Sequence, residues 1–433
     1  MKDKLFSAVE KIVKHELISG SFYIFLGGMA ANVFAFLLNL FLARKLSYSD
    51  YGIFASLSSI VTLAAILASS TNTIIVRFVA EYFSKNEIGK LQVFYKKTLM
   101  VFILLSVLIF LLFAIFSPII KNFLNIDNTL YILLVGLAVA VLYLQNLNSA
   151  FLQGLMKFKF FSFLNSIGNL IKLLVGVILV FAGFRVFSGL LAILIMSLGM
   201  FIVGFIPLRF LLAKQSVSKA SVPIKEIFKY SLPSFFAVLF LTAFTSADVI
   251  LVKHFFSAHL AGFYAGLSLI GKVIFYFTAP IPLVMFPLLV KRHHRGEKFH
   301  NLFYLSLLLV IVPSLAITGF YFLFPKFVIN LFLGGRDYQF IAPYLGFFGI
   351  YLSIFSLLYV CVNFFLSINK TRIVFPVMLA AISQIALIYI FHNDFYQVIG
   401  VSILVSAILL VFLLGYYLKL FVSGKNNAVL SAV

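Results

Sequence analysis

The feature that most constrains this chain is a series of long apolar stretches with almost no charge inside them. A helix needs roughly 20 apolar residues to cross a bilayer core. Hydrophobic residues fill 63% of the 433 positions and charged residues only 10%, so lipid must solvate most of the chain. We predict an all-α integral membrane protein with twelve transmembrane helices, at 22–43, 53–79, 98–118, 130–152, 163–183, 188–208, 230–251, 261–290, 301–324, 341–367, 373–391 and 398–418.

The net charge of +21 would suit a nucleic-acid-binding protein, but the positions of the basic residues favour another explanation. Of the 33 lysines and arginines, 24 lie at the two termini and in the even-numbered loops, and only 7 lie in the odd-numbered loops. Cytoplasmic loops carry such an excess. We therefore predict that both termini are cytoplasmic and that nucleic acid is not a partner.

One decapeptide occurs nearly twice. YGIFASLSSI (51–60) and AGFYAGLSLI (261–270) agree at five of ten positions, each at the outer start of a predicted helix. Six helices separate the copies, which predicts two parallel six-helix bundles related by a pseudo-two-fold axis. The expected division is a cytoplasmic amphipathic or merely solvated segment 1–21, bundles 22–212 and 230–420, a cytoplasmic linker 213–229 and a cytoplasmic tail 421–433.

The second predicted helix of each bundle contains residues that weaken a helix. SSTNT (69–73) corresponds, at an offset of 210 residues, to APIPL (279–283). Proline removes a backbone donor, and serine, threonine and asparagine can bond the freed backbone groups. We predict a hinge or polar cavity at this depth in both halves, with close packing of small residues as the alternative. The residues concerned are Thr71, Asn72, Pro280, Pro282 and Pro287.

Two lysines and one aspartate lie well inside predicted spans, where a charge is costly and usually faces a water-filled interior. Lys272 lies about 16 Å into its helix, near the midplane, which predicts a cavity position. Lys172 either lines the cavity or extends to the interface. Asp248 either binds a coupling cation or pairs with Lys253. The deep charges are mainly positive, so an anionic substrate is expected.

Two arginines at helix ends are further candidates for contact with an anionic substrate. Arg77 lies four residues before Glu81, a spacing that also suits an interfacial ion pair. Arg44 ends the first helix on the outer side, where an anchoring role at the interface is the alternative.

Several motifs do not withstand inspection. GLSLIGKV (266–273) resembles a phosphate-binding loop, but Val273 replaces the required serine or threonine and the motif lies inside a membrane helix. KRHHRGEKFH (291–300) gathers histidines without acidic or cysteine partners, so a solvated basic loop is expected. A single cysteine provides neither a disulfide framework nor a metal cluster. We predict no metal and no cofactor.

The segment LARKLSYSDYGIFASLSSI (42–60), with STNTIIVRFVAEY (70–82) and YAGLSLIGKVIF (264–275), resembles the polysaccharide-transporter branch of the multidrug/oligosaccharidyl-lipid/polysaccharide (MOP) flippases. The resemblance implies alternating-access movement of a polyprenyl-diphosphate-linked oligosaccharide from the cytoplasmic to the outer leaflet of a bacterial or archaeal inner membrane. It implies a central cavity lined by helices 1, 2, 7 and 8. The implied partners are membrane lipid, the anionic lipid-linked oligosaccharide, H⁺ or Na⁺ as coupling ion, and other polysaccharide assembly proteins.

Other classes fit the sequence less well. The G-x-x-x-D-R signature of major facilitator transporters is missing from loop 80–97. A multidrug antiporter of the MOP fold should favour acidic cavity residues, and the first helix has none. A membrane glycosyltransferase or polysaccharide polymerase needs a substantial extramembrane loop with catalytic residues, and every loop here is short. We therefore expect a transporter and not an enzyme.

Overall fold

The computed structural model describes residues 16–213, 235–294, 299–335, 337–368 and 370–420. Most of the segment 1–21, the linker 213–229 and the tail 421–433 lie outside these residues. Within the described ranges the secondary structure is helical, without a strand. Eleven helices are long and apolar enough to cross a membrane, or twelve if one bent pair counts as a single span. The prediction of an all-α, multi-pass membrane protein is therefore confirmed.

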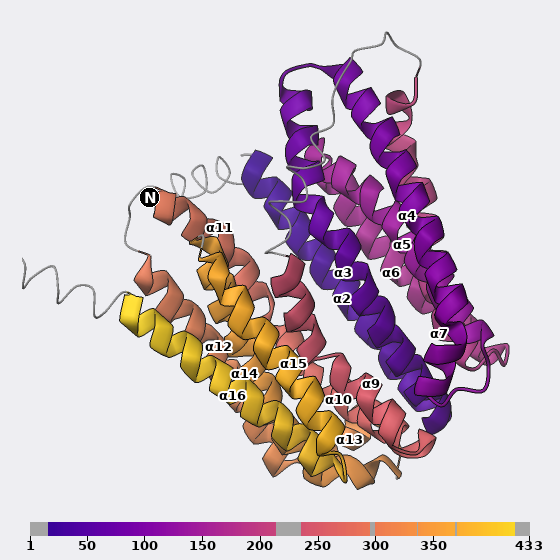
Figure 1. Cartoon of the computed structure of the whole chain (residues 1–433), viewed down its shortest axis with the longest axis vertical. Helices are drawn as coiled ribbons and strands as arrows, with labels where there is room; N and C mark the ends of the chain where they lie inside the picture. Colours follow the sequence, from indigo (N-terminus) through magenta and orange to yellow (C-terminus); the bar gives the residue numbers. More distant parts are fainter. Residues whose placement is uncertain (1–15, 214–234, 295–298, 336, 369, 421–433) are drawn as a thin grey trace, which may run out of the picture. The chain divides into compact units, whose positions relative to one another are not determined.

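The chain forms two compact units, which Figure 1 colours along the sequence. Unit 1 comprises Met1–Leu46 and Ile60–Leu232, and unit 2 comprises Ser47–Ser59 and Pro233–Val433. The short segment Ser47–Ser59 begins the second long helix, yet it packs with the second half of the chain. One helix is therefore shared by both units.

Unit 1 is a bundle of long helices. They are α2 (Glu16–Lys45), α3 (Tyr48–Ser84, which starts in unit 2), α4 (Ile88–Phe123), α5 (Leu130–Gly154), α6 (Phe158–Phe181) and α7 (Val186–Phe205), followed by the 3₁₀ turn η1 (Ile206–Leu211). Helices α2 and α6 pack along each other over most of their length (Figure 1). Small residues permit this close approach: a Cβ added to Gly176 would lie 2.5 Å from Leu38 Cδ1.

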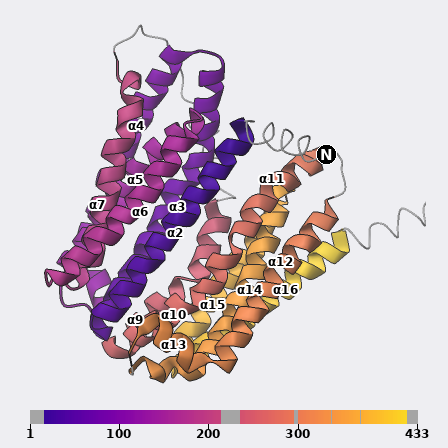
Figure 2. The same ribbon diagram turned by 180° about the vertical axis from the view of Figure 1, so that it is seen from behind.

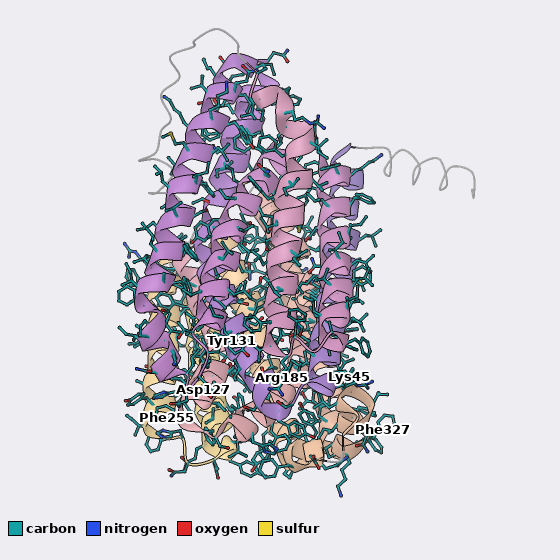
Figure 3. The ribbon with its side chains drawn as sticks, turned by 90° about the vertical axis from the view of Figure 1, so that its right-hand side faces the viewer. Lys45, Asp127, Tyr131, Arg185, Phe255 and Phe327 are labelled. Atoms are coloured by element: carbon teal, nitrogen blue, oxygen red, sulfur yellow. The ribbon has the colours of Figure 1, made fainter. Side chains whose placement is uncertain are left out.

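The loops of unit 1 alternate between its ends as the sequence predicts. Figure 3 shows Lys45, Asp127 and Arg185, which belong to the first, third and fifth loops, at the same end of the unit. Odd-numbered loops therefore share one membrane side in this unit.

Unit 2 is organised around one buried helix, α14 (Ala342–Ser367). Helices α12 (His300–Leu323), α16 (Phe395–Leu418) and α10 (Ala258–Thr278) pack against it, and Figure 2 shows α12, α14 and α16 side by side. The remaining elements are Phe235–Phe244, α9 (Ala247–Phe255), α11 (Pro280–His294), α13 (Pro325–Leu333), η2 (Asp337–Ile341), η3 (Thr371–Ile373) and α15 (Val374–Ile390).

Two helices of unit 2 are interrupted. Phe235–Phe244 and α9 form one span bent by 45° at Thr245 and Ser246. Helix α10 ends at Thr278 and α11 begins at Pro280, whose ring lacks the N–H that would continue the backbone ladder. The proline pattern at 279–283 therefore does mark a break between two helices.

The corresponding region of α3 is continuous. All residues from Tyr48 to Ser84, including 69–73, are α-helical. SSTNT therefore causes no break in α3, and the hinge or polar cavity predicted there stays a prediction. The physical reason is that α3 has no proline there, and the Thr71 hydroxyl donates to the Ala68 carbonyl of its own helix at 2.8 Å. The polar side chain is satisfied without any loss of backbone bonds.

The two copies of the repeated decapeptide contact each other inside unit 2. A Cβ added to Gly52 would lie 2.8 Å from the backbone nitrogen of Gly262, and one added to Gly262 would overlap the carbonyl of Tyr48. Both glycines are required because the two backbones touch. The residues that the two copies share therefore lie where α3 and α10 contact each other.

Candidate functional site

Asp248 lies in the first turn of α9, immediately after the bend, and its side chain is fully buried. Its Oδ2 atom accepts a hydrogen bond of 3.0 Å from the Tyr264 hydroxyl of α10. Its Oδ1 atom is buried without a hydrogen-bond partner among the described residues. A buried carboxylate with one free oxygen is expensive unless a cation or proton meets it.

Lys272 provides an opposite charge that acts on this carboxylate. It lies two turns beyond Tyr264 on α10, is half-buried, and interacts electrostatically with Asp248. Tyr264 is therefore the side-chain hydrogen-bond partner of Asp248, Lys272 interacts with it electrostatically, and the pairing with Lys253 stays a prediction. Together the three residues form a charged group inside unit 2.

The bend beside Asp248 is supported by side chains from two other helices. A break leaves carbonyls of the last turn without their helical donors. The Phe244 carbonyl accepts instead from the Tyr351 hydroxyl of α14 and, at 3.3 Å, from the Gln384 amide of α15. Gln384 also donates to Ser402 of α16 at 2.9 Å. Side chains of α14 and α15 thus satisfy the backbone carbonyl that the bend leaves without a helical donor.

Sequence reasoning missed Tyr264, Tyr351 and Gln384. Tyr264 had a detectable signal, because it occupies the repeat position where the first copy has Phe54, and the added hydroxyl is the group that meets Asp248. Gln384 is a lone amide in an apolar helix, which is costly in a membrane unless it finds partners. Tyr351 gives no comparable signal among the many aromatic residues.

The second interruption also has a polar support. The Thr278 hydroxyl donates to the Ile274 carbonyl at 2.9 Å and lies 3.0 Å from the Ser356 hydroxyl of α14. Pro280 is half-buried and Pro282 is buried, whereas the side chain of Pro287 lies outside the described residues. The hinge role of these prolines stays a prediction.

In unit 1 the predicted residues are separate from any comparable charged group. Lys172 is half-buried on α6 and forms no salt bridge with a described residue. Thr71 and Asn72 are half-buried on α3, and Asn72 Oδ1 is buried without a hydrogen-bond partner among the described residues. Unit 1 therefore offers hydrogen-bonding groups but no described carboxylate beside its lysine.

The two arginine candidates are exposed at helix ends. Arg44 lies in the last turn of α2. Glu81 forms its salt bridge with Lys85 at 2.6 Å, and Arg77 acts on the same carboxyl electrostatically at longer range. The hydrogen bond from Lys85 lowers the pKa of the exposed Glu81 carboxyl. Lys85 is thus the direct ion-pair partner of Glu81, and the substrate role of Arg77 stays a prediction.

A search for metal-binding geometry gives no candidate within the described ranges, where no three His, Cys, Asp or Glu side chains gather. The histidine-rich segment 291–300 lies partly outside these ranges.

A family model described as polysaccharide biosynthesis protein matches residues 17–293, well over half of the chain. The chain belongs to this family. The matched residues cover unit 1 from position 17 onward. In unit 2 they include Asp248, Tyr264 and Lys272. No curated protein matches the sequence.

Solved structures show that the family member has the MOP transporter fold. It is similar to an inward-facing multidrug resistance MATE family transporter of the MOP superfamily, with a TM-score of 0.65, 15% identity, and coverage of 88% of this chain and 93% of the other. It is similar to the lipid II flippase MurJ in an inward closed conformation, with a TM-score of 0.67, 16% identity, and coverage of 91% and 87%. It is also similar to the MATE multidrug transporter DinF-BH, with a TM-score of 0.65 and 16% identity. The match covers 94% of this chain and 96% of the other.

Proposed function

We propose that the protein moves a polyprenyl-diphosphate-linked oligosaccharide from the cytoplasmic to the outer leaflet of a bacterial or archaeal inner membrane. The family match over residues 17–293 carries this proposal, since the family is one of polysaccharide biosynthesis. The MOP fold supports it, because one structural neighbour is named as a flippase of lipid II. Both termini face the cytoplasm in this proposal, as the basic loops predict.

The physical need for a protein is clear from the substrate. A diphosphate joined to sugars loses its hydration when it enters hydrocarbon, whereas the polyprenyl tail does not. Half-buried lysines inside membrane helices can replace that hydration with charge-assisted hydrogen bonds. Lys272 in unit 2 and Lys172 in unit 1 are the residues that we assign to the diphosphate. The two bundles, 22–212 and 230–420, act as the two halves of an alternating-access transporter.

We assign ion coupling to Asp248. Binding of substrate cannot drive net movement, so a gradient or consumption of the product must do so. The buried, unpartnered Oδ1 atom of Asp248 would gain from a proton or Na⁺. Neutralising this carboxylate also releases Lys272 from its electrostatic partner, which links the ion to the cationic residue.

The decisive experiment measures transbilayer movement of polyprenyl-diphosphate oligosaccharides in proteoliposomes. We expect transport by the wild-type protein and at least a tenfold loss in Lys272→Ala, about what one charge-assisted hydrogen bond contributes. Lys272→Arg should retain most activity as the matched control. No transport by the wild type across a panel of such lipids would exclude the flippase function.

A second candidate function is export of organic cations by a MATE-like antiporter. The buried acidic residue Asp248 and the similarity to MATE structures favour it. The same proteoliposomes distinguish the two functions when they are loaded with fluorescent organic cations, whose efflux the flippase proposal predicts to be absent.

A further inference from the structure

Helix α6 of unit 1 has two chemically different sides. One side carries large apolar residues that are exposed as expected for lipid contact, namely Phe163, Leu174 and Ile178 at 61%, 52% and 64%. The polar residues follow helical spacing on a different side. They are Ser162, Asn165, Ser166, Asn169 and Lys172. A helix that merely crossed lipid would not keep three strongly polar side chains in register.

The polar side of α6 is the side next to α2. The Ser166 hydroxyl donates to the Gly27 carbonyl of α2 at 3.1 Å, and a Cβ added to Gly27 would overlap Ser162. Leu38 and Gly176 form a second contact further along. The two helices therefore run in the same direction with an offset that keeps Asn32 of α2 level with Asn169 of α6.

Helix α2 adds two more amides to this region. Asn32 is exposed and Asn39 is half-buried, and they lie seven residues apart on the same side of α2. Exposed Met29 lies three residues before Asn32 and so shares its side of α2, whereas exposed Val33 lies on a different side from Asn39. Only the amides of α6 are thus turned away from the exposed apolar side of their own helix.

These amides remain accessible and keep unused hydrogen-bonding capacity. Asn165 and Asn169 are half-buried, and Asn169 Nδ2 donates to the Asn165 carbonyl at 3.0 Å. Asn39 Nδ2 donates to the Ala35 carbonyl at 2.8 Å. An asparagine has two donors and an oxygen with two lone pairs, so bonds to its own helix do not saturate it.

We propose that Asn165 and Asn169 of α6 form a recognition surface for the sugar part of the lipid-linked oligosaccharide, with Lys172 at its diphosphate end. This inference rests on the proposed function and adds the residues that read the sugar. A sugar hydroxyl is both donor and acceptor, which is the combination that an amide matches. The surface therefore selects hydroxyl-rich headgroups, whereas Lys172 attracts any diphosphate.

The test compares two lipids that differ only in sugar content. Proteoliposomes of the full chain receive a fluorescent polyprenyl diphosphate carrying either one sugar or a pentasaccharide. The double variant Asn165→Leu/Asn169→Leu keeps the branching and the number of side-chain heavy atoms and removes both amides. We expect pentasaccharide transport to fall about tenfold, as two lost neutral hydrogen bonds imply, and single-sugar transport to fall far less. Lys172→Gln should slow both lipids to the same extent.

Two controls separate recognition from folding. Asn363→Leu changes an asparagine of unit 2 whose Nδ2 donates to its own helix at 2.7 Å, and it should leave the ratio of the two rates unchanged. Asn165→Gln/Asn169→Gln serves where the leucine variant does not fold, because longer amides should still alter the ratio. An unchanged ratio in the folded variants, with active wild type, overturns this inference alone. Inactive wild type with both lipids overturns the proposed function and this inference with it.

Discussion

The first two helices of unit 1 are continuous, whereas the helices at the corresponding positions of unit 2 are interrupted. In unit 1, α2 and α3 are continuous over 30 and 37 residues. In unit 2, the equivalent spans are broken, one by a 45° bend before α9 and one between α10 and α11. The unit with broken helices is also the one that holds the buried carboxylate. A break frees backbone groups, and here the freed Phe244 carbonyl takes its donors from α14 and α15 just before Asp248 begins α9.

The largest expected effect tests whether the charged group of unit 2 is the coupling site. Asp248→Asn removes the negative charge and retains the shape, so an ion gradient should no longer accelerate transport. Gradient-driven uptake in proteoliposomes, compared with uptake without a gradient, gives the answer. Undiminished gradient dependence in this variant would remove Asp248 from coupling.

Introducing a proline into α3 tests the difference in helix continuity. Asn72→Pro removes a backbone donor from a continuous helix and should destabilise unit 1 by about 3 kcal/mol or more. Pro280→Ala changes the first residue of α11, where proline is tolerated, and should change stability by less than about 1 kcal/mol. Thermal unfolding of the purified proteins measures both, and equal losses would contradict the comparison.

The glycine contact tests how tightly the repeated segments pack. Gly262→Ala forces a Cβ into the Tyr48 carbonyl and should destabilise the protein by about 1–3 kcal/mol. Gly28→Ala in α2 meets nothing within 4 Å and should be neutral or stabilising by up to about 1 kcal/mol. Thermal unfolding provides the comparison, and a neutral Gly262→Ala would show that the helices separate readily here.

The smallest effect concerns the support of the bend. Tyr351→Phe removes one donor from the Phe244 carbonyl but leaves the Gln384 amide, so the expected loss is about 1 kcal/mol. Adding Gln384→Leu leaves the carbonyl unpartnered, and the double variant should lose more stability than the sum of the two single changes. Strict additivity would mean that water or another group already serves this carbonyl.

The sequence predicts the helices well because lipid imposes a simple rule. Twelve apolar stretches had to become helices, and the proline pair at 280 and 282 correctly marked a break. The same rule says little about which polar residues meet. The bond between Tyr264 and Asp248 joins residues 16 apart, and that between Gln384 and Phe244 joins residues 140 apart. Such pairs depend on how the helices pack against one another. The residue pattern within one helix does not determine that packing.

The sequence does not reveal that the helix stays continuous at SSTNT. Small polar residues either open a helix or bond within it, and only the backbone decides between these outcomes. In α3 the ladder stayed intact and Thr71 bonds to its own turn. The prolines of unit 2 left no such choice, because a missing N–H cannot be restored by a side chain.

The division of α3 between the two units has a mechanical consequence. Its first residues, Ser47–Ser59, are fixed in unit 2 by the Gly52–Gly262 contact, and from Ile60 onward it belongs to unit 1. A continuous hydrogen-bonded helix resists bending and twisting much more than a loop does. At Ser59 and Ile60 the chain therefore passes from one unit to the other within a continuous helical turn, which is a stiffer connection than a loop would provide.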